Sequence, residues 1–444
     1  MQTTRRLTSF AVLVAIIRVT ILSYMVVGSA CAYATDLIAP GIHPKMAAGG
    51  GQTVSRGAAA VFYNPANMIY SKFIEPYLDV SFAQVSYTYQ HTNVDEFDPV
   101  VVNVTAPPIT AGLTIRPTPS IVIGGAIMPT ASGAVQEVPG VPIELTPGNF
   151  QVGDVSNKQA AMKIAGGGAF RFDHYLTIGA GMFYNTEKTQ ILVTAEDSED
   201  PVIDALYAGT WTQIIVGARS ELMERKFVLG LSYKTAVVAP YKGDILYNLS
   251  EESDYQVFEG VNYVPAAIGF GAETRFGDFG VFFDYVREMW SGGRAVYKSG
   301  IGPDPAEVDF IDTNNIVGGA KLWFGKHMLT AAGGMHGANI GNGYSPGAEA
   351  AVEAGLKGED PKAASLQAEE EDDGSIGGVQ FGNLAAIPRI VASGGYRYKL
   401  QDHGFLETGA QYQTGTRIVP EGSPGTGQYT LKVIMLSAGM SFGF

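Results

Sequence analysis

The chain has 444 residues, of which 46% are hydrophobic and only 16% are charged, and its formal net charge is −14. So low a charged fraction is unusual for a soluble protein and makes residence in a membrane the first possibility to test. The net negative charge disfavours nucleic acid as a partner, because phosphate binding requires a basic face. After about residue 35, no window holds the roughly 18 consecutive apolar residues that a spanning helix needs, which leaves strands as the spanning elements.

Residues 1–34 have the features of an export signal: a basic start, an apolar run, and the small residues of Ala32-Tyr33-Ala34 at a cleavage site. The sequence therefore predicts a signal peptide that is removed after Ala34. An uncleaved anchor is the alternative, disfavoured because Arg18 interrupts the apolar run. Cys31 is the single cysteine, so cleavage would remove disulfides, thiolate metal sites and a cysteine nucleophile together.

Beyond this signal, segments alternate between apolar and small or polar residues with a period of two, which is typical of β-strands. In the last of them, Leu436, Ala438, Met440, Phe442 and Phe444 alternate with Ser437, Gly439, Ser441 and Gly443. Segments 162–172, 268–276 and 316–324 repeat the pattern, with their charged residues on the side away from the apolar one. A soluble sandwich permits this arrangement, but the export signal and the terminal phenylalanine favour a membrane barrel whose apolar side faces lipid.

Fourteen segments fit this pattern, an even number, as closed bacterial barrels require. We expect strands at 76–90, 108–117, 119–129, 160–172, 174–190, 210–220, 225–236, 263–277, 278–290, 314–325, 326–338, 388–400, 402–414 and 430–444. Short turns alternate with longer stretches at 91–107, 130–159, 191–209, 291–313 and 339–387, which are expected to be loops. The predicted fold is all-β: a 14-stranded antiparallel transmembrane β-barrel over residues 76–444.

One of these stretches, residues 346–378, is rich in Ala, Glu and Gly and contains an acidic run. We expect it to be an extracellular loop insertion. It is either a solvated insertion or a loop that contacts divalent cations or other surfaces.

Residues 35–75 do not alternate and are rich in glycine and alanine. About 40 residues are too few to bury a core of their own. A barrel of fourteen strands is wider than the eight-stranded one that side chains fill, so it must hold a channel or a plug. We therefore expect residues 35–75 to form a hatch, or plug, inside the lumen.

The stretch GAAAVFYNPANM, residues 57–68, closely resembles the hatch signature of the FadL family of outer-membrane transporters. Residues 227–245, 264–290 and 387–413 also match the pattern of that family, in the same order along the chain. The resemblance implies a fourteen-stranded barrel with an N-terminal hatch, located in the bacterial outer membrane. It also implies that a hydrophobic ligand enters from an outer groove, occupies an interior pocket and leaves sideways through the wall. The acidic residue that often precedes the aromatic pair in this family is absent near Gly57.

Several hatch residues are candidate ligand contacts. Phe62, Tyr63 and Met68 would supply apolar surface, unless they only anchor the plug to the wall, and Arg56 would hold a carboxylate. Leu37 and Ile38, at the start of the processed chain, are further candidates by resemblance, although the aromatic residue found there in relatives is missing. Asn64, Pro65 and Ala66 form the hatch motif, since an asparagine before proline favours a turn. An inward Asp284 is expected to pair with a charge on the plug.

No catalytic constellation is evident in the sequence. The six histidines lack metal-ligand spacing, and Gly49-Gly50-Gly51-Gln52-Thr53 lacks the ending of a phosphate loop. We therefore predict no enzyme, no cofactor and no metal. The predicted function is passive uptake of hydrophobic compounds, foremost long-chain fatty acids. The alternatives are an aromatic-hydrocarbon channel and a surface adhesin or structural barrel.

The expected partners are the hydrophobic ligand, the lipid and lipopolysaccharide of the outer membrane, and the barrel-assembly machinery, which would recognise Phe444. Nucleic acid is not expected among them.

Overall fold

The computed structural model describes residues 42–90, 100–106, 108–146, 149–195, 203–224, 226–247, 254–291, 296–298, 306–307, 311–338, 387–400, 404–419 and 427–444. The predicted signal peptide and the acidic loop 346–378 lie outside them. No helix in this part of the chain is long and apolar enough to cross a membrane.

Within these residues, nineteen strands form one antiparallel sheet. The strands are β1 (Ile74–Gln90), β2 (Val100–Ala106), β3 (Ile109–Thr118), β4 (Ile121–Thr146), β5 (Asn149–Arg171), β6 (Leu176–Ala195), β7 (Ile203–Leu222), β8 (Phe227–Lys234), β9 (Val237–Tyr247), β10 (Asp254–Val264), β11 (Ala266–Phe276), β12 (Phe279–Met289), β13 (Val296–Lys298), β14 (Ala306–Glu307), β15 (Thr313–Phe324), β16 (His327–His336), β17 (Arg389–Leu400), β18 (Gly404–Val419) and β19 (Gly427–Phe442).

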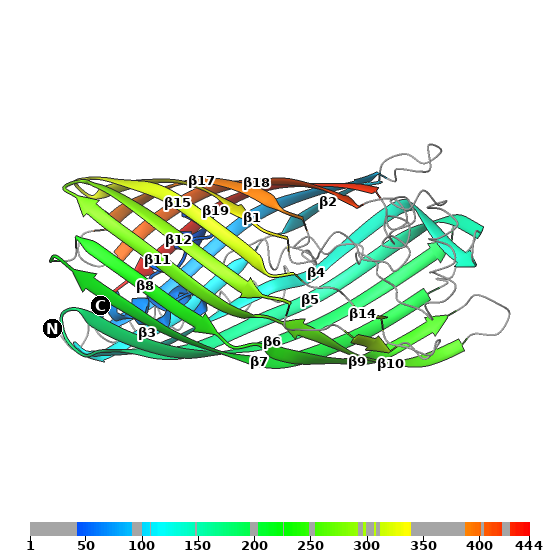
Figure 1. Cartoon of the computed structure of the whole chain (residues 1–444), viewed down its shortest axis with the longest axis horizontal. Helices are drawn as coiled ribbons and strands as arrows, with labels where there is room; N and C mark the ends of the chain where they lie inside the picture. Colours follow the sequence, from blue (N-terminus) through cyan, green and yellow to red (C-terminus); the bar gives the residue numbers. More distant parts are fainter. Residues whose placement is uncertain are drawn as a thin grey trace, which may run out of the picture.

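Five pairs of these strands continue one another along the same line of the wall. β2 and β3 are one such pair, because both pair with β1: β2 with residues 83–89 and β3 with residues 74–80. The pairs β8/β9, β10/β11, β12/β13 and β14/β15 behave in the same way. The described wall is therefore crossed fourteen times, and the pairing of β1 with β19 closes it into a barrel (Figure 1). The predicted closed, fourteen-stranded barrel is confirmed.

The predicted strand boundaries are accurate at one end of the barrel and too short at the other. The described turns after β11 and β15 lie at one end, where Gly277 and Gly325 adopt positive φ angles of 62° and 61°. Toward the other end β4 and β5 continue as one long hairpin through most of the stretch 130–159, which was predicted to be a loop. The prediction was wrong there because prolines and glycines obscure the alternation, and the β4–β5 ladder absorbs them through register shifts.

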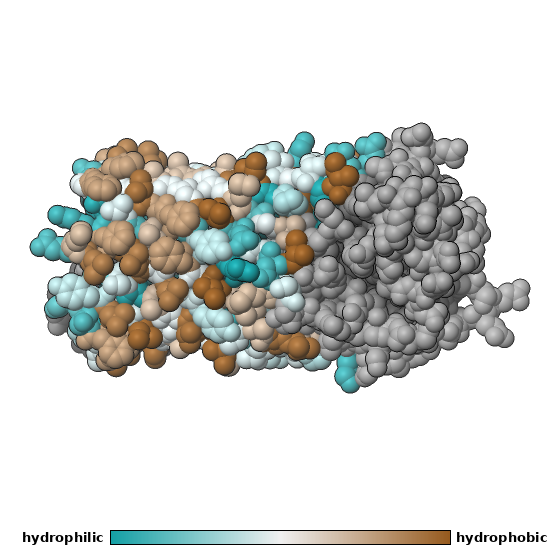
Figure 2. All heavy atoms as spheres, in the orientation of Figure 1, coloured by the Kyte–Doolittle hydropathy of each residue, from teal (hydrophilic) through white to brown (hydrophobic). Residues whose placement is uncertain are grey.

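The two faces of the wall differ as the alternation predicts. Phe270 and Leu436 are exposed on the outside, by 39% and 55%, whereas Ser437, the neighbour of Leu436, is 6% exposed and faces the lumen. Apolar side chains are distributed over the outer surface of the described half of the barrel in Figure 2. Such an apolar exterior is stable in contact with hydrocarbon but not in contact with water, so the barrel spans a membrane.

Residues 42–72 lie inside the barrel and are called the plug below. The plug consists of α2 (Ile42–Met46), the 3₁₀-helices η1 (Gly57–Phe62) and η2 (Pro65–Tyr70), and their connections. α2 contacts β16 to β19, η1 contacts β1 and β3 to β6, and η2 contacts β4 to β7. In Figure 1 the plug lies at the end of the barrel that carries the short turns. Because it touches strands on all sides, the plug fills the bore at this level.

Candidate functional site

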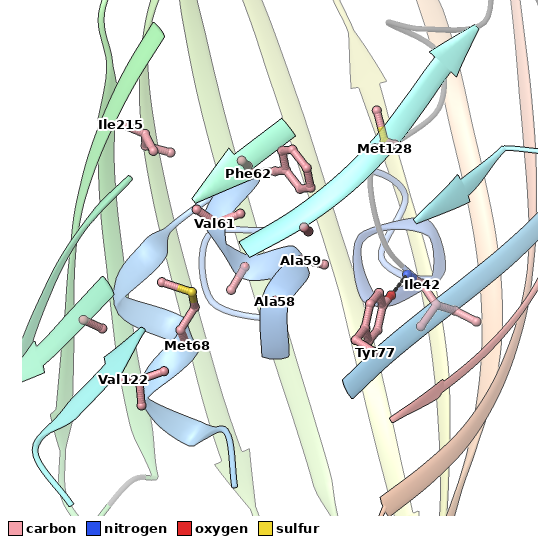
Figure 3. Packing of buried hydrophobic residues seen from close by; sticks show 14 of the residues in the cluster. Ile42, Ala58, Ala59, Val61, Phe62, Met68, Tyr77, Val122, Met128 and Ile215 are labelled. Carbon is pink, nitrogen blue, oxygen red and sulfur yellow. Dashed lines mark hydrogen bonds between the residues drawn. The ribbon is translucent and has the colours of Figure 1, made fainter. Parts of the chain in front are cut away.

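The plug is held first by apolar packing against β4 to β7. Ala58, Ala59, Val61, Phe62 and Met68 lie in one buried cluster with wall residues that include Val122, Met128 and Ile215 (Figure 3). Phe62 stacks on Phe183 of β6, with ring centroids 5.8 Å apart. Two of the predicted ligand contacts, Phe62 and Met68, therefore pack against the wall while the plug is seated. This packing is what the alternative interpretation of the sequence expects, in which these side chains only anchor the plug to the wall.

Glycines on the inner face of the wall allow the plug to approach closely. A Cβ atom added at any of these glycines would lie 3.2 Å or less from a plug atom. We call them the glycine belt: Gly112, Gly167, Gly179, Gly181, Gly217, Gly230, Gly269, Gly271, Gly395, Gly409 and Gly439. At Gly217 that atom would lie 2.2 Å from Asn64 Oδ1, and at Gly395 it would lie 2.2 Å from Met46 Sδ. The wall is therefore shaped to hold the plug.

The hatch motif forms the turn that was expected. Asn64 precedes η2, its Oδ1 accepts from Ala66 N at 3.1 Å, and Pro65 occupies the first position of η2. Asn64 Nδ2 donates to Gln52 O at 3.2 Å and to Ala218 O at 3.0 Å. A single buried amide thus caps η2, fixes a second plug segment and joins both to β7.

Arg219 of β7 makes a second polar connection. Its Nη1 donates to Thr53 O and to Asn67 Oδ1, both at 3.0 Å, and its Nε donates to Tyr70 Oη at 2.8 Å. Asn67 Nδ2 in turn donates to Gln52 O at 2.9 Å. One buried guanidinium therefore satisfies three acceptors, one in the connection before η1 and two in η2.

α2 is connected to the opposite wall by polar contacts. Ile42 N donates to Tyr77 Oη at 2.7 Å, and Lys45 Nζ lies 2.5 Å from Asp79 Oδ2. His43 Nε2 lies 3.0 Å from Glu407 Oε1. Burial lowers the pKa of His43 to about 4, so this imidazole is neutral at pH 7 and its N–H donates to the carboxylate.

The sequence predicted that Asp284 pairs with a charge on the plug, and this prediction was wrong. Asp284 Oδ2 instead accepts from the main-chain N–H of Gln52 at 3.1 Å. A main-chain amide can reach this carboxylate because the plug loop approaches β12 closely. A Cβ atom on Gly50 would lie only 2.7 Å from Asp284 Oδ2.

Arg56 lies at the level of η2, where its guanidinium is 5.8 Å from the centre of the Tyr70 ring. Burial, together with Arg397 and Arg219, lowers the pKa of Arg56 to about 10, and it remains a cation at neutral pH. A different cation, Lys234 of β8, lies near the predicted contact Tyr63. Its Nζ is 6.0 Å from the centre of the Tyr63 ring and 5.6 Å from the centre of the Phe183 ring. Leu37 and Ile38 lie outside the described residues.

An apolar stripe runs along the inner face of β1 and β19. It consists of Ala83, Val85, Tyr87, Tyr429, Leu431, Val433 and Met435, which are all buried. Val85 is opposite Val433 in register and Tyr87 is opposite Leu431, while the Tyr87 and Tyr429 rings lie 5.9 Å apart. On β18, the inner face beside the stripe is polar and carries Gln411, Gln413 and Arg417.

One end of the stripe lies next to the plug. Met435 stands four residues before Gly439, which touches Ile42 of α2. From Tyr429 to Met435 the stripe spans about 20 Å, at the rise of an antiparallel strand. This arrangement places a continuous row of apolar side chains on the inner face of two adjacent strands.

Comparison with solved structures identifies the fold. The chain is 14% identical to a Pseudomonas aeruginosa FadL homologue, with a TM-score of 0.63 over 91% of this chain and 98% of that one. The toluene transporter TodX of Pseudomonas putida gives a TM-score of 0.62 at 11% identity, over 91% and 98% of the two chains. The toluene transporter TbuX of Ralstonia pickettii gives 0.59 at 12% identity, over 92% and 100%. The chain has the FadL-type fold.

At the level of the fold, this confirms the resemblance noted in the sequence. No family model and no curated protein sequence matches the chain.

Within this FadL-type fold, sequence reasoning missed the stripe, although the segment YTLKVIML carried a signal. In residues 429–436 both alternating sets are apolar, apart from Thr430 and Lys432, whereas a strand between lipid and a polar lumen needs only one apolar set. Lys45 and Asp79 were also missed, since they are 34 positions apart and nothing local relates them. Among the described residues no group of three or more His, Cys, Asp or Glu side chains could hold a metal ion.

Proposed function

We propose that this chain is an outer-membrane channel of the FadL family that takes up hydrophobic compounds passively, with long-chain fatty acids as the foremost class. The observation that carries the proposal is the apolar stripe on the inner face of β1 and β19. An acyl chain on this stripe would exchange water for apolar contact, at about 0.8 kcal/mol for each buried CH₂ group. The plug, which closes the bore beyond the stripe, would then have to move for the ligand to proceed.

The orientation follows from the turns. Barrels of the bacterial outer membrane have short periplasmic turns and long extracellular loops, so the short-turn end and the plug would face the periplasm. Ligand would enter at the opposite end, meet the stripe first and reach the plug second. Neither a nucleotide nor a catalytic group is part of this proposal, and ligand consumption inside the cell would give uptake its direction.

A monoaromatic hydrocarbon is the second candidate ligand. Two of the similar structures are named as toluene transporters, and the third as a FadL homologue. The rings of Phe62 and Phe183, stacked 5.8 Å apart, offer a surface suited to an aromatic ligand once the plug moves. Phe62, Tyr63 and Met68 remain proposed ligand contacts for this displaced state. The adhesin alternative concerns loop 346–378, outside the described residues.

Uptake by cells that depend on this protein tests the function. The variant Leu431→Gln/Val433→Gln places two amides on the stripe and should lower uptake of labelled oleate about tenfold at limiting concentration, since each removes apolar contact. The control is Val228→Gln, because Val228 is a buried residue of β8 that belongs neither to the stripe nor to the buried cluster around Phe62 and Met68. It should retain most of the uptake.

Heat-modifiable migration of the purified barrels must first show that both variants fold. Oleate uptake at the wild-type level in the stripe variant would contradict the stripe as the ligand path. Uptake of toluene but not of oleate by the wild type would favour the hydrocarbon channel.

A further inference from the structure

A buried ion pair joins the plug to the wall where the stripe ends. Lys45 on α2 is 2% exposed and Asp79 on β1 is fully buried, with Nζ and Oδ2 2.5 Å apart. Lys45 Nζ also donates to Ser81 Oγ at 2.6 Å, and Ser81 Oγ donates to Ser437 Oγ at 2.9 Å. The ammonium group therefore faces both a carboxylate of the wall and a pair of hydroxyl groups.

These hydroxyl groups lie between the ion pair and the stripe. Ser81 is opposite Ser437 in register, and the next inward pair along the strands is Ala83 with Met435, the first pair of the stripe. About 7 Å separates successive inward positions on a strand. A ligand that moves along the stripe with its polar head foremost therefore meets the two serines first and Lys45 next.

For a buried ion pair, replacing one charged partner by another costs less free energy than separating the two partners. Removing one partner of such a pair leaves an uncompensated buried charge and is strongly destabilising. Replacing one carboxylate by another leaves Lys45 paired throughout and avoids this cost. Only a ligand that carries a carboxyl group can make the exchange.

We propose that Lys45 and Asp79 form a latch that a carboxylic acid ligand opens by exchange. The ligand arrives as the neutral acid, because contact with the apolar stripe disfavours the ionised form. Its O–H bond breaks and the proton moves to Asp79, while the resulting ligand carboxylate pairs with the ammonium group of Lys45. One cation and one anion are present before and after the transfer, so no unpaired charge is created. This inference rests on the proposed function and narrows its ligand class to carboxylic acids.

Opening this latch would remove the charged contact between α2 and β1. The remaining polar contacts of α2 with the wall include Ile42 N with Tyr77 Oη, at 2.7 Å, and Ser393 Oγ, which donates to Met46 O at 2.7 Å. These two are hydrogen bonds of neutral groups, which are weaker than an ion pair, and a third contact joins the neutral imidazole of His43 to the Glu407 carboxylate at 3.0 Å. A hydrocarbon lacks the carboxyl group and would leave the latch closed, so the wild-type protein would distinguish a fatty acid from its methyl ester.

The test measures exposure of the plug in the purified, full-length protein. The substitution Ala47→Cys, in a Cys31→Ser background, places a thiol at a buried position next to α2. Its rate of reaction with a maleimide is measured alone, with oleic acid and with methyl oleate. We expect oleic acid to raise the rate roughly tenfold and methyl oleate to leave it unchanged, although the ester binds.

Two sets of variants isolate the latch. Lys45→Met/Asp79→Leu removes both charges at similar volume and should abolish the difference between acid and ester, while Asp79→Asn should raise the rate without ligand. The matched control is Lys321→Met/Glu273→Leu, because that ion pair, 2.8 Å apart, joins two strands of the wall to each other. The control should keep the response to oleic acid, and heat-modifiable migration establishes that each barrel is folded.

The outcomes separate this inference from the function on which it rests. Equal responses to the two ligands in the wild type, or an acid-specific response that persists in the Lys45→Met/Asp79→Leu variant, would overturn the latch while leaving uptake of hydrophobic ligands in place. Failure of labelled oleic acid and methyl oleate to bind at all would overturn the proposed function, and the latch with it.

Discussion

The guanidinium carbon of Arg219 lies 4.5 Å from the centre of the Tyr70 ring, and its Nε donates to the hydroxyl group of the same tyrosine at 2.8 Å. Arg219 belongs to the wall and Tyr70 to the plug. Since the same guanidinium also donates to Thr53 O and Asn67 Oδ1, it is the connection through which β7 holds the second half of the plug.

Replacing this guanidinium should therefore loosen the plug. In Arg219→Met, buried acceptors of the plug and the Glu221 carboxylate lose a donor, which should lower the free energy of unfolding by about 3 kcal/mol. Single-channel recordings in planar bilayers should show more frequent and larger openings than the wild type. Tyr70→Phe removes one hydroxyl group and should cost only about 1 kcal/mol. A variant lacking Arg219 that stays closed and equally stable would contradict this role.

The glycine belt gives a second prediction. Gly217→Ala would place a methyl group 2.2 Å from Asn64 Oδ1, a distance that forces the capping turn of η2 to shift. The variant should be less stable by about 1–3 kcal/mol, as overpacked sites are, and should leak small solutes in a liposome-swelling assay.

The matched substitution is Gly166→Ala, because the nearest atom to a Cβ at Gly166 is a wall oxygen, Gly124 O, at 4.0 Å. This control should behave as the wild type. Equal leakage from the two variants would show that the belt does not seat the plug.

Much of the fold could be predicted from the sequence because a membrane barrel obeys one dominant rule. Each strand must present apolar side chains to lipid at every second position, so the alternation around Phe270 and Leu436 identifies strands and their faces together. The rule weakens along the β4–β5 hairpin, where prolines and glycines interrupt the alternation and the pairing shifts register. The strand ends on that side were therefore predicted too short.

The candidate site was harder to predict because its contacts join residues that are far apart along the chain. The motif Asn64-Pro65-Ala66 could be interpreted locally, since a cap and a proline act within a few positions. Lys45 and Asp79 show no such local relation, and the glycine belt becomes visible only when the plug is in place. Arg56 was predicted to hold a ligand carboxylate because it precedes the hatch motif, whereas in the folded barrel Lys234 lies near the rings of Tyr63 and Phe183.

The amide of Asn64 carries the third prediction. In Asn64→Asp the oxygen that accepts from Ala66 N is kept, but the donor to Gln52 O and Ala218 O is lost and a charge is buried. The expected cost is about 3 kcal/mol, more than for Asn64→Ala, in which only the hydrogen bonds are lost. Urea unfolding followed by heat-modifiable migration measures both. If the aspartate variant were the more stable of the two, Asn64 would act through its cap alone.

Docking of α2 should weaken as the pH falls. His43 faces Glu407 of β18, Arg397 of β17 and Arg56 of the plug, and burial is the largest of the effects that lower its pKa to about 4. A released His43 would recover an ordinary pKa of about 6.5. Between these two values the released state binds a proton that the docked state does not, so the docked state is favoured fully above pH 6.5 and loses stability as the pH falls toward 4.

The loss should approach about 3 kcal/mol at the acid end of this window. The rate at which a maleimide reacts with a thiol introduced by Ala47→Cys should therefore increase as the pH falls from 7 to about 4.5, once corrected for the ionisation of the thiol. His43→Gln keeps a donor for Glu407 but cannot take up the proton, so its corrected rate should be independent of pH. His327→Gln, at the start of β16, should follow the wild type, because the His327 ring contacts Tyr396 of β17 and not Glu407. A pH dependence that survives in His43→Gln would assign the proton uptake to another group.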